Sequence, residues 1–342
     1  MPLKKIGNQT IKLLNPPSII SHYSIVGPKE GDGPLKDYFD LILEDDLWGE
    51  ESFEKAERKI QEQAVRAAVD GAQLSLQDID FLLAGDLLNQ IVASGYAARE
   101  LAIPFFGLYG ACSTMTESLS LGAMLVEGGF ADRVVCATSS HFSSAERQFR
   151  FPLEYGAQRS FSAQWTVTGA GATVLSSYGS GPYITYITPG RIIDPGITDA
   201  ANMGAAMAPA AIDTLVNHFQ DTGFQPSDYD LIISGDLGIV GKSIVIDLMK
   251  EKGYDISKNY TDCGVEIFNP NTQDTHAGGS GCGCSAVVFN GYILKEMKKG
   301  RFKRVLFMAT GALHSTTINQ QGESIPSIAH AVTIDINNEQ VM

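Results

Sequence analysis

The sequence is poor in basic side chains, in cysteine and in long apolar runs. Lysine and arginine number 25 against 39 aspartates and glutamates, giving a net charge of −14, which argues against nucleic acid or an anionic membrane surface as a partner. The five cysteines are an odd number, which favours free thiols in a reducing compartment over a disulfide framework. Neither a signal-peptide pattern nor a run of about 18 apolar residues is present, so the sequence predicts a cytoplasmic protein without a transmembrane segment.

What the chain does have is apolar content and glycine. Its 342 residues, of which 44% are hydrophobic and 19% charged, correspond to about two domains. They are enough to bury a core without help from disulfides or metals. Thirty-five glycines against 14 prolines predict many tight turns and close backbone contacts.

One short segment of the sequence occurs twice, 150 residues apart. Residues 78–87 read DIDFLLAGDL, and residues 228–237 read DYDLIISGDL. Each copy has an acidic start, a short apolar run and a Gly-Asp end, a pattern that predicts a turn followed by a buried strand.

A second repeat follows the first in both halves. Cys112 lies 18 residues before Phe130, and Cys284 lies 18 residues before Phe302, with apolar residues at helical spacing in between. Each predicted helix is followed by glycine, a basic residue and another strand-like run. The order strand, loop, cysteine, helix, strand is therefore the same in both halves.

This duplication predicts an α/β protein whose two halves are fused around one core. Alternating strands and helices are typical of parallel sheets covered by helices. The stretch SSYGSGP at 176–182 interrupts the pattern. We therefore expect an N-terminal half over residues 1–178 and a C-terminal half over residues 179–342.

Ten strings spread over nearly the whole chain carry a resemblance to a known family. They are GPKEGDGPL at 27–35, AGDLLNQ at 84–90, FGLYGACST at 106–114, TSSH at 138–141, AERQFRFPLEYG at 145–156, TVTGAGA at 166–172, MGAAMAPAA at 203–211, AGGSGCGCSAVV at 277–288, ATGALHS at 309–315 and ESIPSIAHAV at 323–332. In this order they resemble the stage V sporulation protein AD family of endospore-forming bacteria, within the thiolase superfamily. The first and fifth strings are not general thiolase signatures, which makes the narrower match specific.

The resemblance implies a thiolase-like fold, in which two duplicated βαβαβ-type halves form α-β-α-β-α layers. It also implies a non-catalytic protein that binds dipicolinic acid, free or as its calcium chelate, for uptake into the developing spore. The implied partners are membrane-embedded proteins of the same sporulation operon. The implied location is the spore-core side of the inner spore membrane, with peripheral association. No cofactor is implied, and calcium enters only as part of the ligand.

Cys112 follows Gly110 and Ala111 and precedes the predicted helix of the first half. The N–H groups and the partial positive charge at a helix start lower the pKa of a thiol and make it a nucleophile. In thiolases the acyl-carrying cysteine is expected at this place. The same N–H groups, with those of Ser113 and Thr114, are able to bind a carboxylate of a ligand. The alternative is a small buried apolar residue.

The bases that would activate this cysteine are missing where the resemblance places them. Ser280 and Gly281 replace the histidine and proline of the thiolase Gly-His-Pro segment, and Asp236 stands in the loop where ketosynthases carry a histidine. The stretch around Ala309 lacks the second thiolase cysteine. Because catalytic residues act as a unit, an isolated nucleophile loses most of its effect. His141 is the remaining candidate base, and equally a histidine satisfied by loop backbone.

Charged and aromatic side chains are concentrated in the string AERQFRFPLEYG. Within it, Glu146, Arg147 and Arg150 lie among aromatic residues, a combination that suits an anionic ligand with a planar ring. The alternative is a salt-bridged loop at a subunit interface. Asp86 and Asn89 follow the first repeated strand, and a carboxylate there suits a calcium-chelated ligand and repels a bare dianion.

Three functions stay open at this point: a dipicolinate-binding protein without catalysis, an acyltransferase or ketosynthase that uses Cys112, and a structural scaffold of the uptake complex. The missing bases disfavour the second. The run at 105–109 is apolar on both faces, which predicts a strand buried on all sides and, with the resemblance, a homodimer. Cys282 and Cys284 lack the second ligand pair of a structural zinc site, so no metal site is predicted.

Overall fold

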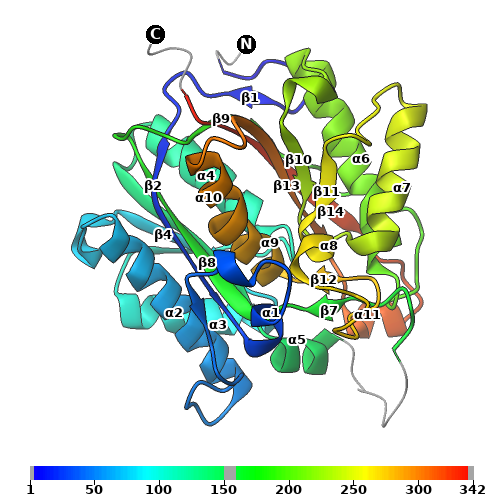
Figure 1. Ribbon diagram of the computed structural model, residues 1–342, viewed down its shortest axis with the longest axis horizontal. Helices are drawn as coiled ribbons and strands as arrows, with labels where there is room; N and C mark the ends of the chain where they lie inside the picture. Colours follow the sequence, from blue (N-terminus) through cyan, green and yellow to red (C-terminus); the bar gives the residue numbers. More distant parts are fainter. Residues whose placement is uncertain (1–3, 150–158, 338–342) are drawn as a thin grey trace.

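The computed structural model describes residues 4–149 and 159–337. A large mixed sheet runs through this part of the chain, with its main strands in the order β11-β10-β13-β14-β9-β2-β8-β6-β4-β5 (Figure 1). The strands of the first half are β2 (Ser18–Val26), β4 (Phe81–Gly85), β5 (Phe105–Gly107), β6 (Arg133–Ser140) and β8 (Gly169–Ser176). Those of the second half are β9 (Tyr183–Thr188), β10 (Leu231–Ser234), β11 (Tyr260–Asp262), β13 (Arg304–Ala312) and β14 (Ser327–Asp335). Four short strands lie at the margins: β1 (Ile11–Lys12), β3 (Leu41–Ile42), β7 (Trp165–Thr166) and β12 (Gly279–Ser280).

The strand order confirms the duplication. Counted inward from its own edge of the sheet, the first half has the order β5, β4, β6, β8, β2, and the second half has the matching order β11, β10, β13, β14, β9. The two halves meet where β2 lies beside β9. Asp80 and Asp230, which occupy the same place in the repeat, each accept hydrogen bonds from two backbone N–H groups at the start of the neighbouring strand, β6 or β13. The two repeated segments therefore perform the same local task in both halves.

The expectation of parallel sheets is wrong for the inner strands of each half. β4 is parallel to β5 and β6, and β10 is parallel to β11 and β13. In contrast, β8 runs antiparallel to β6 and β2, and β14 runs antiparallel to β13 and β9. The described part of the chain forms no crossover helix packed on the sheet between β6 and β8, or between β13 and β14, and only a parallel connection requires one.

Helices cover both outer faces of the sheet and also fill the space between its two halves. The helices are α1 (Pro28–Gly31), α2 (Phe53–Gly71), α3 (Val92–Leu101), α4 (Thr114–Glu127), α5 (Phe142–Phe149), α6 (Met203–Thr222), α7 (Gly238–Glu251), α8 (Cys263–Ile267), α9 (Cys282–Val288), α10 (Leu294–Lys298) and α11 (Thr316–Gln320). α2 and α3 lie on one outer side, α6 and α7 on the other, and α4, α9 and α10 in the middle (Figure 1). The layers are therefore α-β-α-β-α, as expected of a thiolase-like fold.

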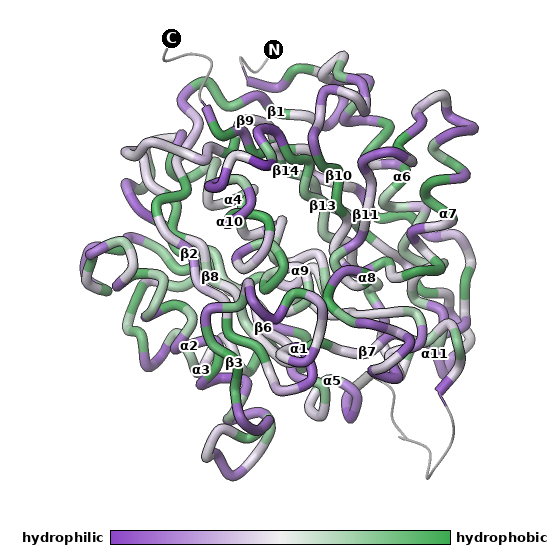
Figure 2. Tube along the Cα trace, in the orientation of Figure 1, coloured by the Kyte–Doolittle hydropathy of each residue, from purple (hydrophilic) through white to green (hydrophobic). Residues whose placement is uncertain are grey.

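The hydrophobic pattern of the helices explains these positions. On the middle helix α4, Met115, Leu119 and Ala123 are fully buried, and every residue of α9 is buried. The outer helix α2 buries one face only, with Ile60 and Ala64 directed to the sheet. In Figure 2 the apolar colour accordingly gathers on the inner helices and strands. Each large aliphatic side chain buried in this way contributes about 1.5–3 kcal/mol.

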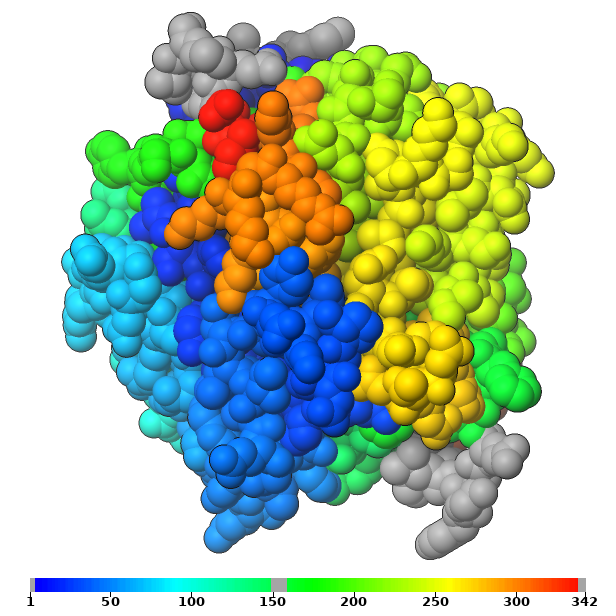
Figure 3. Space-filling model, in the orientation of Figure 1, coloured from blue at the N-terminus to red at the C-terminus, as the bar shows by residue number. Residues whose placement is uncertain are grey.

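The two halves interlock rather than lying side by side. Residues near position 300 rest directly on residues near position 40 at the surface shown in Figure 3, where Lys295 Nζ donates to the Tyr38 carbonyl and to Asp40 Oδ1, both at 2.6 Å. The chain passes from β8 to β9 through residues 177–182. Within the described residues no helix is both long and apolar enough to cross a bilayer.

Within the single chain, the strand predicted to be buried on all sides forms an edge of the sheet, and its full burial requires the predicted homodimer. β5 pairs with β4 on one side only, and Phe106 and Tyr109 are each 48% exposed in the single chain. Apolar residues on both faces of a strand indicate burial but do not say which chain provides it. The homodimer stays a prediction, and β5 is the surface to which it applies.

Candidate functional site

Cys112 lies in a tight turn between β5 and the middle helix α4. Ala111 has a left-handed backbone with φ 49°. Ser113 Oγ donates to the Gly110 carbonyl at 2.7 Å, and Thr114 Oγ1 donates to the Ala111 carbonyl at 2.6 Å. These side chains are therefore used to fix the turn, and they hold the Cys112 side chain at the inner end of α4.

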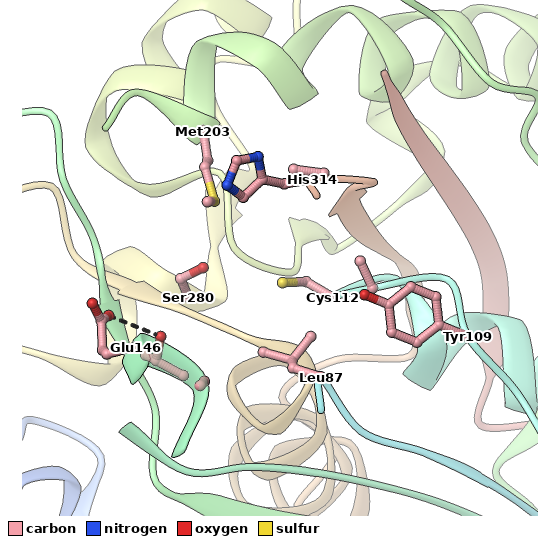
Figure 4. Close-up of a pocket in the computed structure, with 11 residues that line it drawn as sticks. Leu87, Tyr109, Cys112, Glu146, Met203, Ser280 and His314 are labelled. Carbon is pink, nitrogen blue, oxygen red and sulfur yellow. Dashed lines mark hydrogen bonds between the residues drawn. The ribbon is translucent and has the colours of Figure 1, made fainter. Parts of the chain in front are cut away.

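A cavity lies in front of the Cys112 sulfur, and the empty space in and immediately outside it, including the part open to solvent, is about 430 Å³. Figure 4 shows the sulfur directed toward Ser280, with Leu87 on one side and His314 and Met203 on the other. Both halves of the chain contribute to the wall. The lining residues are Leu87, Tyr109, Ala111, Cys112, Ala145, Glu146, Thr166, Met203, Ser280, Ala312 and His314.

The carboxylate of Asp236 lies behind this wall and contacts Cys112. Asp236 is fully buried, and its oxygens accept hydrogen bonds from Thr310 Oγ1 at 2.7 Å, Ser280 Oγ at 3.1 Å and the Gly281 N–H at 3.3 Å. The Cys112 thiol lies close enough to this carboxyl group for each to shift the pKa of the other. Burial raises the pKa of Asp236 to about 6, although its hydrogen bonds oppose the rise.

These surroundings shift the pKa of Cys112 in the direction opposite to the one predicted from the sequence. Burial raises the pKa of Cys112 well above the usual thiol value, and the negative charge of Asp236 raises it further. The prediction that the start of α4 lowers this pKa is therefore wrong, because desolvation and a carboxylate outweigh the helix charge. A thiol that keeps its proton is a hydrogen-bond donor and a poor nucleophile.

The backbone of β13 packs directly against the Cys112 turn at Gly311. A Cβ atom at Gly311 on β13 would come 2.2 Å from the Gly110 carbonyl and 3.3 Å from the Cys112 nitrogen. No side chain fits there without moving the Cys112 turn. The site thus combines a protonated thiol, a buried carboxyl group and hydroxyl donors.

The sequence matches one family along almost its whole length. The profile of the family described as Stage V sporulation protein AD (SpoVAD) matches residues 7–335. The chain belongs to this family. Stage V sporulation protein AD of Bacillus subtilis (strain 168) is 48% identical to it over 333 residues, which cover 97% of this chain and 98% of that protein.

Solved structures show where the fold of this sporulation family belongs. A variant of OleA from Xanthomonas campestris has a TM-score of 0.61 at 15% identity and covers 96% of this chain and 99% of its own. 3-Oxoacyl-[acyl-carrier-protein] synthase III from Aquifex aeolicus VF5 has a TM-score of 0.57 at 14% identity, with 93% and 99% covered. Human mitochondrial 3-ketoacyl-CoA thiolase, solved with CoA, has a TM-score of 0.56 at 14% identity, with 95% and 99% covered. The fold is therefore thiolase-like.

In this member of the SpoVAD family, the structure brings some of the predicted site residues together. Cys112, Glu146 and Ser280 all line the cavity. Glu146 reaches it from α5 and accepts a hydrogen bond from Thr166 Oγ1 at 3.2 Å. Ser113 and Thr114 are buried beneath Cys112 and support its turn instead of facing the cavity.

Asp86 and Asn89 were predicted to bind the ligand, but neither lines the cavity. The Asp86 carboxylate is buried and accepts hydrogen bonds from the N–H groups of Leu88 at 2.8 Å and Ser94 at 2.7 Å. Asn89 lies in an adjoining outer groove, where its N–H donates to Gln148 Oε1 at 2.8 Å. The prediction chose the first-half aspartate of the repeat, whereas its second-half equivalent, Asp236, is the one that lies beside Cys112.

The basic and histidine candidates also have other contacts. His141 Nε2 contacts the Asp46 carbonyl at 2.8 Å, which agrees with the backbone-satisfied alternative. Arg147 is 55% exposed and forms an ion pair with Glu54 at the surface. Arg150 lies outside the described residues. Among the described lining residues no arginine or lysine occurs.

Several site residues were not recognised from the sequence as ligand contacts. Tyr109, Met203 and His314 line the cavity, and Asp236, which the sequence presented only as a missing histidine, is the partner of Cys112. A signal existed for Asp236, since it stands at the Gly-Asp end of the repeated segment. Tyr109, Met203 and His314 span more than 200 residues of sequence, and only the fold brings them together.

Proposed function

We propose that this protein binds dipicolinic acid, free or as its calcium chelate, in the Cys112 cavity and serves its uptake into the developing spore without catalysing acyl transfer. The observation that carries the non-catalytic part is the contact of Cys112 with the Asp236 carboxylate. A catalytic cysteine needs a neighbour that removes its proton and stabilises the thiolate. The negative charge of a carboxylate beside a buried thiol raises the pKa of the thiol and so disfavours the thiolate.

The cavity lining supports a flat aromatic acid as the ligand. Tyr109 offers an aromatic ring, which suits a pyridine ring. Cys112 and Ser280 bring polar atoms to the same wall, and Asp236 lies directly behind them. Carboxyl groups repel a bare dianion and suit one whose charge calcium has neutralised, since calcium prefers oxygen ligands. We therefore expect the calcium chelate to bind more tightly than free dipicolinate at neutral pH.

The biological setting of the proposal follows from the family. We propose that the protein acts on the spore-core side of the inner spore membrane, beside membrane-embedded proteins of the same sporulation operon. It needs no cofactor of its own in this account. A homodimer formed through β5 would place Tyr109, which follows that strand, near the subunit boundary.

Binding and labelling experiments would distinguish this function from two alternatives, an acyltransferase and a structural scaffold. The fold likeness to OleA, ketosynthase and thiolase structures favours an acyltransferase as the alternative. If Cys112 is an active nucleophile, incubation with acyl-CoA leaves a thioester on it, detectable as a mass increase of the intact protein. If the protein is only a scaffold, neither acyl-CoA nor dipicolinate binds.

The direct test is calorimetry with dipicolinate, with calcium or with a chelator, on matched variants of α5. Ala145 is 1% exposed and lines the cavity, so Ala145→Leu fills the space and should weaken binding at least tenfold. Ser143→Leu adds the same side chain to the same helix outside the lining and should leave the affinity within about twofold. Equal affinities of both variants would place the ligand elsewhere.

A further inference from the structure

The loops that follow β4 and β10 are copies of one another, yet their aspartates point in different directions. Asp86 and Asp236 occupy the same position of the repeat. The Asp86 carboxylate folds back on its own loop, where it accepts from the N–H of Leu88, two residues on, and from that of Ser94. The Asp236 carboxylate turns away from its loop to Ser280, Thr310 and Cys112.

In the second half, Asp262 instead of Asp236 accepts the hydrogen bonds of the loop N–H groups. Gly238 is the repeat counterpart of Leu88, and its N–H donates to Asp262 Oδ1 at 2.9 Å. The Leu237 N–H donates to Asp262 Oδ2 at 2.9 Å, and Ser234 Oγ donates to the same oxygen at 2.6 Å. Asp262 is fully buried at the end of β11. It thus binds the Asp236 loop at three points.

The strand register shows why only the second half has this arrangement. On β10, Ser234 pairs with Asp262 of β11. On β4, Ala84, the repeat counterpart of Ser234, pairs with Gly107 of β5. The first half therefore has glycine where the second has Asp262, and it has no hydroxyl to meet a carboxylate. Its loop must be capped by its own aspartate.

We propose that Asp262 is a positioning residue that holds the 234–238 loop so that the Asp236 carboxylate faces Cys112. Buried N–H groups need an acceptor. With Asp262 present, Leu237 and Gly238 are satisfied and Asp236 is available to the site. Without it, Asp236 is the nearest carboxylate able to accept from Gly238, as Asp86 accepts from Leu88. The carboxylate would then leave Cys112.

The consequence is measurable at the thiol. The charge of Asp236 is one of the causes that raise the pKa of Cys112, so turning Asp236 away lowers that pKa. The Asp262 carboxyl is itself buried, and burial raises its pKa to about 7. Further titratable groups near Cys112, its turn or its cavity are Tyr109, Glu117, Glu146, Cys282, Cys284 and His314.

The experiment is the pH dependence of Cys112 alkylation by iodoacetamide, followed by peptide mass spectrometry so that only this cysteine is scored. Asp236→Asn should lower the apparent pKa and raise the rate near neutral pH by about tenfold, since the thiolate is the reacting form. Asp262→Asn should reproduce this shift although it does not touch Cys112. The double variant should shift no further than Asp236→Asn alone, because both act through one carboxylate.

Two further variants separate positioning from loss of stability. Asp262 also caps α8 by accepting from the Gly264 N–H at 3.0 Å. Asp262→Ser retains a side chain suited to that cap but is too short for the 234–238 loop, and it should show the same shift as Asp262→Asn. Asp86→Asn removes the equivalent cap in the first half and should lower the melting temperature without moving the alkylation profile.

The proposal is overturned if the Asp262 variants, folded by circular dichroism, keep the wild-type alkylation profile while Asp236→Asn shifts it. It is also overturned if Asp86→Asn shifts the profile as much as Asp262→Asn does. Neither outcome depends on whether the cavity binds dipicolinate, because the readout is the thiol itself.

Discussion

At the scale of single residues, the chemistry of the site depends on the neighbours of two equivalent carboxylates, Asp236 and Asp86. Burial and then the charge of Asp236 raise the pKa of the Cys112 thiol, whereas Asp86 in the other half accepts hydrogen bonds from its own loop. Sequence position alone does not distinguish the two, since both follow the same Gly in the same repeat. The side-chain direction depends on whether residue 107 or 262 of the neighbouring strand can accept the loop N–H groups.

Arg147 provides a direct test of the revised site. It is exposed and paired with Glu54, so we expect Arg147→Ala to change the affinity for calcium dipicolinate by less than about twofold, as for other exposed charges. If Arg147 instead paired with a carboxylate of the ligand, its loss should weaken binding at least tenfold. Calorimetry on the variant decides between them, and a tenfold loss would return Arg147 to the ligand site.

Glu30 makes the stability of the protein depend on pH. It is buried, and burial raises the pKa of its carboxyl to about 8 from an ordinary value near 4.5. Between these pH values the folded state binds more protons than the unfolded state, so the free energy of unfolding falls as pH rises from about 5 to about 8. Glu30→Gln stays neutral, and it should be more stable than the wild type by roughly 2–4 kcal/mol at pH 8.

Urea unfolding at pH 5.5 and pH 8 checks this. The two proteins should have similar stability at pH 5.5 and diverge at pH 8. In the variant the free energy of unfolding should still fall as pH rises, but less steeply. The remaining fall comes from groups such as Glu57 and Asp262, because burial also raises their pKa values, to about 8 and about 7. Glu51→Gln, an exposed glutamate paired with Lys55, is the matched control and should follow the wild type. Parallel curves for wild type and Glu30→Gln would show that Glu30 is ionised in the folded protein.

At the scale of elements, the repeated pattern predicted β4, β10 and the helices that begin near Cys112 and Cys284, because short apolar runs and helical spacing are local signals. It did not predict that β8 and β14 run antiparallel, since strand direction depends on connections the pattern does not describe. It also placed β5 in a fully buried position. An apolar strand has the same sequence whether it is covered by its own chain or by another one.

β5 carries the prediction of a homodimer. Phe106 is 48% exposed on this edge strand, and an uncovered apolar edge is a surface that pairs with another strand. Light scattering at micromolar concentration should give twice the chain mass for the wild type. Phe106→Asp places a charge in the contact and should give a monomer. Ile192→Asp, a 60% exposed position outside the strand, should remain dimeric, and a monomeric wild type would contradict the prediction.

At the scale of the whole molecule, two halves of one repeat have become unequal. The layers are those of the thiolase-like solved structures, and the residues around the cavity come from both halves. The family and the fold followed from strings along the chain. The composition of the cavity did not, because Tyr109, Met203 and His314 meet only after the halves have interlocked.

The central claim is that dipicolinate occupies the cavity in front of Cys112 and that this cysteine does not act as a nucleophile. The measurement that tests it most directly is the rate of Cys112 alkylation by iodoacetamide as calcium dipicolinate is added. The account predicts at least tenfold protection at saturation, with a midpoint equal to the dissociation constant from calorimetry. An unchanged alkylation rate at concentrations where calorimetry shows full binding would contradict it.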